Sequence, residues 1–273
     1  MSLSRLHVAC LQLCSSEDID DNFKRIQNIL APYQAGDFHL IVLPENAILL
    51  THNQALKQAA VQKETYTKIY ERLSLLAKTY KTWLIAGSIL VSDPKKPGKF
   101  FNHCPVFSPD GELVNHYDKI HLFDADLHTE SWRESTHTSP GKQPSSFAIG
   151  EVWNIGLSIC YDLRFPELYR QYSEQGGNIL TVAAAFTVPT GQAHWETLLK
   201  ARAIENQSYV LAAAQSGHHQ DGRDTYGHSM IIDPWGKTLA ILPQGEGIVA
   251  ATLSLEHLHD IRQHLPALQH RRL

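Results

Sequence analysis

One cysteine in this sequence has the surroundings of a catalytic nucleophile. Cys160 comes directly after the apolar stretch 152–159 and shortly before Phe-Pro-Glu, which is typical of the first turn of a helix. A thiol at the end of a buried strand, next to a helix start, is held rigidly and stays reachable for a substrate. The alternative is an ordinary core thiol, because free cysteine is among the most buried residue types. This stretch alone does not decide between the two interpretations.

Three charged residues far from this cysteine in the sequence can supply the rest of the chemistry. Glu45 follows an apolar stretch and a proline, Lys119 lies in His-Tyr-Asp-Lys-Ile-His, and Glu134 lies in a polar segment that ends in Pro-Gly. Attack of a thiol on an amide carbonyl requires a base and a donor that stabilises the oxyanion. We predict Glu45 as the base, and Lys119 with the backbone N–H of Tyr161 as the oxyanion donors. Glu134 is predicted to hold Lys119 and to assist proton transfer to the leaving amine.

Each of these charged residues, taken alone, is also explained by a helix cap or a solvated loop charge. Taken together, they predict the protonation state of the thiol. A lone cation beside a cysteine lowers its pKa from about 8.5. Two carboxylates beside one lysine oppose that shift, so we expect a neutral resting thiol that is activated by the base.

Composition excludes several classes of protein. The chain has 273 residues and a formal net charge of −4, so it has no general basic field for nucleic acid or an anionic membrane. No apolar run approaches the roughly 20 residues of a membrane helix. Four cysteines without a CxxC pair do not form a disulfide scaffold, which favours a cytoplasmic location. The 16 histidines lack metal-ligand spacing, so no metal site is predicted.

Apolar, β-branched runs alternate with amphipathic stretches along the chain. Predicted strands cover residues 6–13, 38–43, 83–91, 152–159, 178–184, 208–214, 228–232 and 248–253, and predicted helices cover 20–30, 63–80, 166–175, 192–206 and 255–264. Hairpin-like turns at 108–111 and 233–236 add antiparallel pairing. We therefore predict one α/β domain over residues 1–273, with two packed sheets that are covered by helices.

Three segments, in their order and wide spacing, resemble the signature segments of the nitrilase superfamily of carbon–nitrogen hydrolases. They are Leu-Pro-Glu45, Tyr-Asp-Lys119-Ile-His-Leu, and Ile-Cys160-Tyr-Asp-Leu-Arg-Phe-Pro-Glu. The resemblance spans nearly the whole chain. It implies a Glu–Lys–Cys triad of Glu45, Lys119 and Cys160, with Glu134 as an additional active-site carboxylate. It also implies a four-layer α-β-β-α sandwich, a homodimer or higher homo-oligomer, and no metal or organic cofactor.

The second half of the chain is similar to the Nit branch of this superfamily, and within it to the amidases that act on deaminated glutathione. The segments that carry this similarity are 193–205, 226–236 and 262–272. The resemblance implies hydrolysis through a thioester, with 2-oxoglutarate and cysteinylglycine as products. Omega-amidase, which acts on 2-oxoglutaramate or 2-oxosuccinamate, is the second expectation. Two alternatives belong to other functional classes. One is a binding protein that kept the fold without catalysis, and the other is a metal-dependent hydrolase.

One further residue bears on the charge of the substrate. Arg164 follows the cysteine by four positions, and in superfamily members that act on carboxylate-bearing substrates an arginine at the matching place binds that carboxylate. We therefore expect a small anionic amide as substrate, although a structural salt bridge to Asp162 or Glu167 would also explain the arginine. Phe186 and Thr187 follow a strand that ends in three alanines, so they either contact substrate or form a plain strand-to-loop junction.

Overall fold

The computed structural model describes residues 3–127 and 130–272. Within them, the first of two large sheets has seven strands, with β6 paired to β5 at one side. Its strands are β17 (Gly247–Ser254), β1 (Arg5–Gln12), β2 (Leu40–Val42), β3 (Trp83–Ile85), β5 (Phe100–Phe107), β4 (Ile89–Ser92) and β6 (Leu113–Asp118). β1, β2 and β3 run parallel to one another. Their carboxyl ends therefore open toward the same edge of the sheet.

The second large sheet has six strands in the described residues. Their order is β16 (Thr238–Leu242), β15 (Ser229–Ile232), β12 (Tyr209–Ala214), β11 (Ile179–Ala184), β10 (Trp153–Ile159) and β9 (Ser146–Ile149). The three central strands β10, β11 and β12 are parallel. Two short ribbons lie apart from the sheets: β7 (Asp124–Leu127) with β8 (Glu130–Arg133), and β13 (Ser216–His218) with β14 (Asp224–Tyr226).

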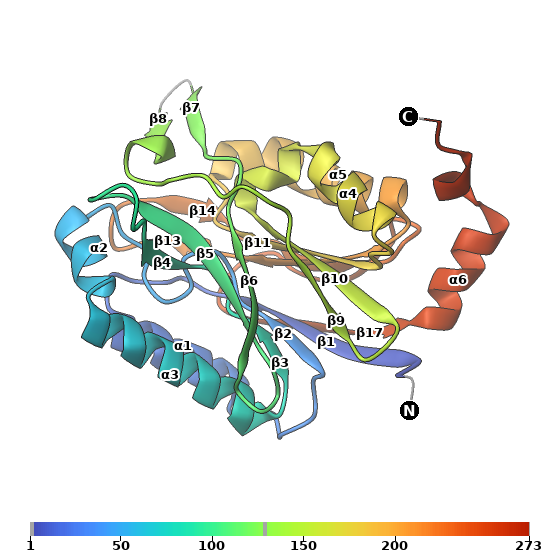
Figure 1. Ribbon diagram of the computed structural model, residues 1–273, viewed down its shortest axis with the longest axis horizontal. Coiled ribbons are helices and arrows are strands. Elements are labelled where there is room, and N and C mark those ends of the chain that lie inside the picture. Colours follow the sequence, from blue (N-terminus) through green and yellow to red (C-terminus); the bar gives the residue numbers. More distant parts are fainter. Residues whose placement is uncertain (1–2, 128–129, 273) are drawn as a thin grey trace.

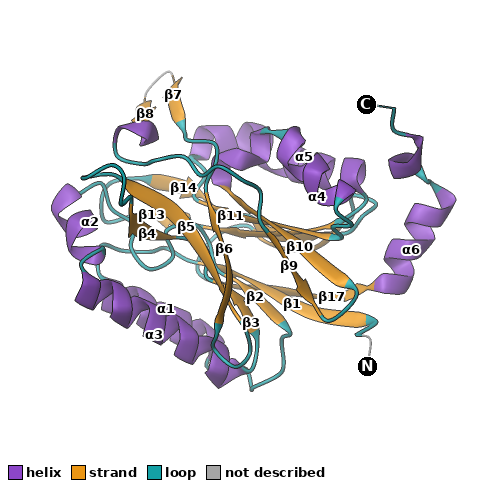
Figure 2. Cartoon of the chain, in the orientation of Figure 1, coloured by secondary structure: helices purple, strands orange, loops and turns teal. Residues whose placement is uncertain are grey.

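Helices cover the outer face of each sheet, as Figures 1 and 2 show. α1 (Ile19–Leu30) and α3 (Lys63–Tyr80) lie on the first sheet, and α4 (Pro166–Glu174) and α5 (Val188–Asn206) lie on the second. The short helix α2 (Gln54–Ala60) precedes α3, and α6 (Leu255–His264) and the short turn η3 (Ala267–His270) follow β17. None of the described helices is long and apolar enough to cross a membrane.

The two sheets pack face to face around one core. Along β1, Val8 and Cys10 point into the core shared with the second sheet, whereas Ala9 and Leu11 pack under α1 and α3. This alternation follows from the period of two along a strand. The four layers are helix, sheet, sheet and helix, so the predicted α-β-β-α sandwich is confirmed. That residues 1–273 form a single domain stays a prediction.

The predicted segment 83–91 is two strands in the structure. β3 and β4 are separated by residues 86–88, where Gly87 has φ of +67°. A Cβ at Gly87 would lie 1.9 Å from the carbonyl oxygen of Pro44, so only glycine permits this close approach. The interruption brings the residues after β2 against residues 86–88.

The predictions missed several elements and one helix start. Strands β5 to β9, β13, β14 and β16 and helix α2 were not predicted, and α5 begins four residues before the predicted position 192. Pro189 lies in the first turn of α5, where proline is well tolerated. The predicted α3 agrees with the structure at both ends, and both predicted hairpin turns join antiparallel strands.

Candidate active site

Cys160 lies at the carboxyl end of β10, where the chain leaves the sheet. It begins the short 3₁₀ turn η2 (Cys160–Arg164) and has φ of +49°, a left-handed conformation that non-glycine residues rarely adopt. Strained backbone of this kind is typical of functional sites and persists only where the surrounding structure imposes it. No local sequence pattern predicts this conformation.

The buried carboxylate of Asp162 fixes the turn that carries Cys160. It accepts the backbone N–H of Ile159 at 2.9 Å and the hydroxyl of Tyr117 at 2.7 Å. It also accepts the backbone N–H of His121 at 3.0 Å and contacts His121 Nδ1 at 2.7 Å. Tyr117 and His121 flank Lys119 in the chain. Asp162 therefore connects the segment of Lys119 to the turn of Cys160.

Lys119 lies between the two predicted carboxylates. Its Nζ donates to Glu45 Oε1 at 3.0 Å and to Glu134 Oε2 at 2.8 Å, and its side chain is 2% exposed. Glu134 begins the short turn η1 (Glu134–Thr136) and also accepts the backbone N–H of Phe123 at 2.7 Å. The structure thus brings Glu45, Lys119, Glu134 and Cys160 to one cavity, and we call these four residues the tetrad.

Asn102 on β5 completes the contacts of the two carboxylates and was not predicted. Its Nδ2 donates to Glu45 Oε1 at 2.8 Å and to Glu134 Oε1 at 3.3 Å. Its Oδ1 is buried and has no hydrogen-bond partner among the described residues. A neutral amide between two carboxylates separates their charges, so Asn102 is a positioning residue in this arrangement.

Glu45 is held from its backbone as well as from its side chain. Its Oε2 accepts the backbone N–H of Ala185 at 3.0 Å, just beyond β11, and its carbonyl accepts Gln215 Nε2 at 2.9 Å. The carboxylate is buried at 4% exposure. Glu45 therefore joins the ends of the parallel strands from both sheets, the usual position of active sites in α/β folds.

The charges of the tetrad shift two pKa values. Burial raises the pKa of the Cys160 thiol, and the negative charge of Glu45 raises it further against the opposing effect of Lys119. The raised pKa has the direction expected for a neutral resting thiol, although its largest cause is burial rather than the neighbouring carboxylates. Burial alone would lower the pKa of the Lys119 ammonium, but the charges of Glu134 and Glu45 outweigh burial and raise it.

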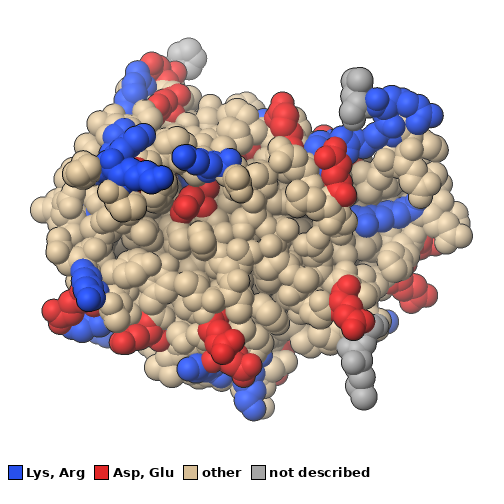
Figure 3. All heavy atoms as spheres, viewed as in Figure 1, with Lys and Arg blue, Asp and Glu red and all other residues tan. Residues whose placement is uncertain are grey.

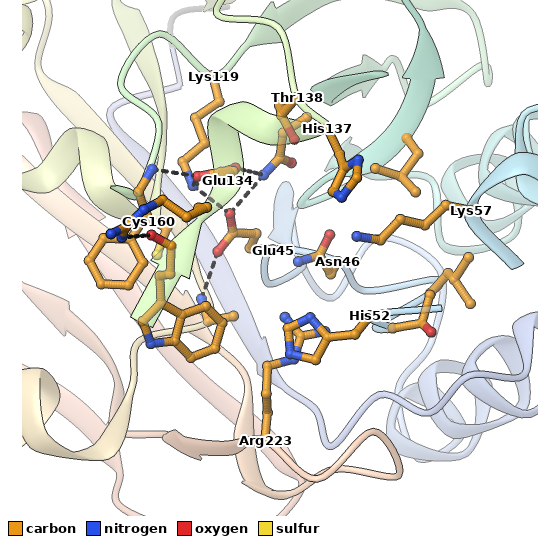
Figure 4. A pocket seen from close by; sticks show the side chains of 18 of the residues that line it. Glu45, Asn46, His52, Lys57, Lys119, Glu134, His137, Thr138, Cys160 and Arg223 are labelled. Atoms are coloured by element: carbon orange, nitrogen blue, oxygen red, sulfur yellow. Dashed lines mark hydrogen bonds and ion pairs between the residues drawn. The ribbon is translucent and has the colours of Figure 1, made fainter. Parts of the chain in front are cut away.

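Figure 4 shows the cavity in front of the tetrad, which has a volume of about 340 Å³. Three basic side chains outside the tetrad line it: Arg133, which forms an ion pair with Asp126, Lys57 from α2, and Arg223 from the turn between β13 and β14. We call Lys57 and Arg223 the cationic wall. His52 and His137 lie beside them, and burial lowers the pKa of both imidazoles. None of these four was among the predicted site residues.

A smaller compartment of about 40 Å³ also adjoins Cys160. It is lined by the predicted substrate contacts Tyr161, Arg164, Phe186 and Thr187. Nη1 and Nη2 of Arg164 each donate to His194 Nδ1 at 3.3 Å, and in the described chain Arg164 forms no ion pair with Asp162 or Glu167. The alternative of a structural salt bridge from Arg164 to Asp162 or Glu167 is therefore not seen in the described residues.

Among residues 3–127 and 130–272, no group of three or more histidine, cysteine, aspartate or glutamate side chains is arranged to hold a metal ion. Of the three other cysteines, Cys10 and Cys104 are buried and Cys14 is half-buried. On the face seen in Figure 3, acidic and basic side chains are interspersed around the periphery.

Comparison with known proteins agrees with this geometry. Residues 7–263 match the family model of carbon–nitrogen hydrolases. A deaminated glutathione amidase of Synechocystis sp. is 37% identical over 265 residues, 96% of this chain and 97% of that protein. The crystal structure of Saccharomyces cerevisiae Nit3, a member of branch 10 of the nitrilase superfamily, has a TM-score of 0.85 at 32% identity, covering 99% of this chain and 97% of Nit3.

The crystal structure of the Caenorhabditis elegans NitFhit protein has a TM-score of 0.92 at 34% identity. That match covers 100% of this chain, which spans 66% of the NitFhit chain. The family match, the sequence relatives and the shared fold agree with the resemblance found in the signature segments. This chain belongs to the carbon–nitrogen hydrolase family.

Proposed function

We propose that this carbon–nitrogen hydrolase is an amidase that cleaves the amide of deaminated glutathione to 2-oxoglutarate and cysteinylglycine. The observation that carries the proposal is a buried thiol in one cavity with the Lys119–Glu45–Glu134 group, with Arg164 in the adjoining compartment. The name of the Synechocystis relative supports the substrate. The acyl half of deaminated glutathione bears a carboxylate, which a guanidinium can bind through two hydrogen bonds.

The proposed reaction begins with transfer of the Cys160 proton to Glu45 as sulfur attacks the amide carbonyl. A carbon–sulfur bond forms, and the electron pair of the carbonyl moves to its oxygen. Nζ of Lys119 and the backbone N–H of Tyr161 stabilise this oxyanion. Removal of one donor of this kind typically reduces the rate by about 10²–10³-fold.

The carbon–nitrogen bond then breaks, and the amine leaves with a proton from a carboxylic acid of the site. Glu134 assists this transfer and keeps Lys119 in place. The acyl group stays on Cys160 as a thioester. Water that has lost a proton to Glu45 hydrolyses the thioester, and the released sulfur regains its proton. Glu45 thus acts as base in both halves of the reaction.

The test compares deaminated glutathione with 2-oxoglutaramate, the substrate of the alternative omega-amidase. We expect the higher kcat/KM on deaminated glutathione, with 2-oxoglutarate and cysteinylglycine released in equal amounts. The Cys160→Ala variant should form neither product while it keeps its melting temperature within about 2 °C. A higher kcat/KM on 2-oxoglutaramate would favour the omega-amidase reading, and retained turnover by Cys160→Ala would refute the proposed nucleophile.

A homo-oligomer and a cytoplasmic location also belong to this proposal. Two exposed apolar side chains, Ile204 at 52% and Trp235 at 62%, support association through the end of α5 and the β15–β16 turn. Light scattering on the purified protein tests the oligomer. A monomer at micromolar concentration would contradict it.

A further inference from the structure

We propose that the cationic wall is a subsite for a carboxylate on the leaving amine of the substrate. In this assignment Lys57 binds the carboxylate of the cysteinylglycine half, while Arg164 serves the acyl half. The inference rests on the proposed function. It assigns the preference for a peptide-like amide over a primary amide to contacts with the leaving amine rather than with the acyl group.

The first support is that Lys57 has no hydrogen-bond or ion-pair partner among the residues that the structure describes. Its side chain is half-buried and extends into the cavity in Figure 4, yet among the described residues its Nζ makes no hydrogen bond or ion pair. A partly buried ammonium without a partner costs free energy. Burial and the nearby charge of Arg223 lower the pKa of Lys57, against the opposing effects of the Glu134 and Asp221 carboxylates. An anionic ligand would supply the missing partner.

The second support is the way in which Arg223 is fixed. Its Nε donates to Asp221 Oδ2 at 2.8 Å, and its backbone N–H donates to Asp221 Oδ1 at 3.2 Å. The Asp221 side chain is 3% exposed, so the pair is rigid. Asp221 offsets the charge of Arg223, and the negative charges of Asp221 and Glu134 reach Lys57 only at a distance, because neither carboxylate forms a hydrogen bond or ion pair with it. Within the described residues, the wall therefore keeps one positive charge without a direct partner.

The third support is the position of Cys160 between two compartments of unequal size. Because the amide carbonyl must lie at Cys160, which lines both compartments, the acyl half can occupy one compartment and the amine half the other. Arg164 lines the compartment of about 40 Å³, and the cationic wall lines the cavity of about 340 Å³. The amine half leaves first while the acyl half stays on sulfur. The larger cavity therefore suits the amine half.

Deaminated glutathione fits both compartments because it carries a carboxylate at each end. 2-Oxoglutaramate has the same acyl half but releases ammonia, so it offers nothing to Lys57. A charge-assisted hydrogen bond contributes about 1.5–3 kcal/mol, equivalent to roughly 10- to 100-fold in kcat/KM. This is the preference that the subsite is expected to add for the extended amide.

The test removes the charge from the protein and from the substrate separately. The substrates are deaminated glutathione, its C-terminal glycinamide and 2-oxoglutaramate. The variants are Lys57→Met and, as a matched control, Lys63→Met, which removes an exposed lysine six residues further along. We expect capping of the glycine carboxylate to lower kcat/KM about 10- to 100-fold in the wild type and in Lys63→Met. In Lys57→Met the cost of capping should be at least about fivefold smaller.

Two results would overturn the subsite. One is an equal cost of capping with and without Lys57. The other is an equal loss by Lys57→Met on deaminated glutathione and on 2-oxoglutaramate, which would assign Lys57 to the acyl half or to the tetrad. Because the comparison is a cycle of two changes, a general effect of the mutation on folding cancels.

A separate measurement distinguishes failure of the subsite from failure of the proposed function. Binding of cysteinylglycine and of cysteinylglycinamide is measured by calorimetry, with no turnover required. We expect the wild type to bind cysteinylglycine at least about tenfold more tightly, and Lys57→Met to lose most of that preference. Equal binding by the wild type would refute the subsite even if deaminated glutathione is the substrate.

Discussion

Lys119 and Lys57 face the same cavity, but the protein treats their charges in opposite ways. Lys119 is 2% exposed and is bound by two carboxylates, which raise its pKa. Lys57 is half-buried, has no partner in the described chain, and its pKa is lowered by burial. A charge that the fold neutralises can be held in one geometry for chemistry. A charge that the fold leaves open is available to a ligand.

The largest expected effect is that of removing the neutralised lysine. In Lys119→Met, loss of an oxyanion donor should lower kcat by about 10²–10³-fold on every amide. Glu45 and Glu134 would also be left buried without their cation, so the free energy of unfolding should fall by about 3 kcal/mol. Steady-state kinetics and urea unfolding measure the two effects. An unchanged kcat in Lys119→Met would show that Lys119 is not an oxyanion donor.

The connection between the Lys119 segment and the nucleophile turn predicts the next effect. Asp162→Asn keeps the size of the side chain but replaces an acceptor of several N–H and O–H donors by an amide. The unfolding free energy should fall by about 2 kcal/mol, and kcat by about tenfold. Asp224→Asn, at an exposed position on β14, is the control. Equal behaviour of the two variants would show that Asp162 does not hold the turn.

A smaller effect concerns the thiol. Because the folded pKa of Cys160 is raised, the thiolate fraction at pH 7 is low and increases as the pH rises. Alkylation of Cys160 by iodoacetamide should accelerate continuously up to at least about pH 9. Peptide mapping separates Cys160 from the half-buried Cys14. In Glu45→Gln the pKa of the thiol should fall, so alkylation at pH 8 should be several-fold faster. A plateau below pH 7 in the wild type would refute a neutral resting thiol.

The smallest expected effect is the change in unfolding free energy when Lys57 is replaced. Since burial already disfavours its charged form, Lys57→Met should leave the unfolding free energy within about 0.5 kcal/mol of the wild type or raise it. Thermal unfolding measures this directly. A loss as large as that of Lys119→Met would mean that Lys57 has a structural partner.

The same contrast explains what the sequence could predict. The tetrad residues lie in segments with strong local patterns, and the amphipathic spacing of residues 63–80 identified α3 at both ends. Lys57 lies in a seven-residue helix without a distinct apolar face, and Arg223 lies in a polar turn. Their proximity arises from packing of residues far apart in the chain. Local patterns carry no signal for it.

Two backbone features were missed for a similar reason. Gly87 interrupts what reads as one apolar strand, because the close approach of Pro44 depends on tertiary packing. Cys160 adopts a positive φ that favours glycine, imposed by the contacts of Asp162 around it. Residue type predicted the chemistry of Cys160, whereas its strained conformation depends on neighbours that the sequence does not reveal.

Acylation of Cys160 during amide hydrolysis can be detected directly. The protein is mixed with deaminated glutathione, quenched in acid within the first turnover, digested and analysed by mass spectrometry. We expect a 2-oxoglutaryl group on the peptide that contains Cys160, and we expect none in Cys160→Ala. A 2-oxoglutaryl group on another residue, together with continued turnover by Cys160→Ala, would show that Cys160 is not the nucleophile.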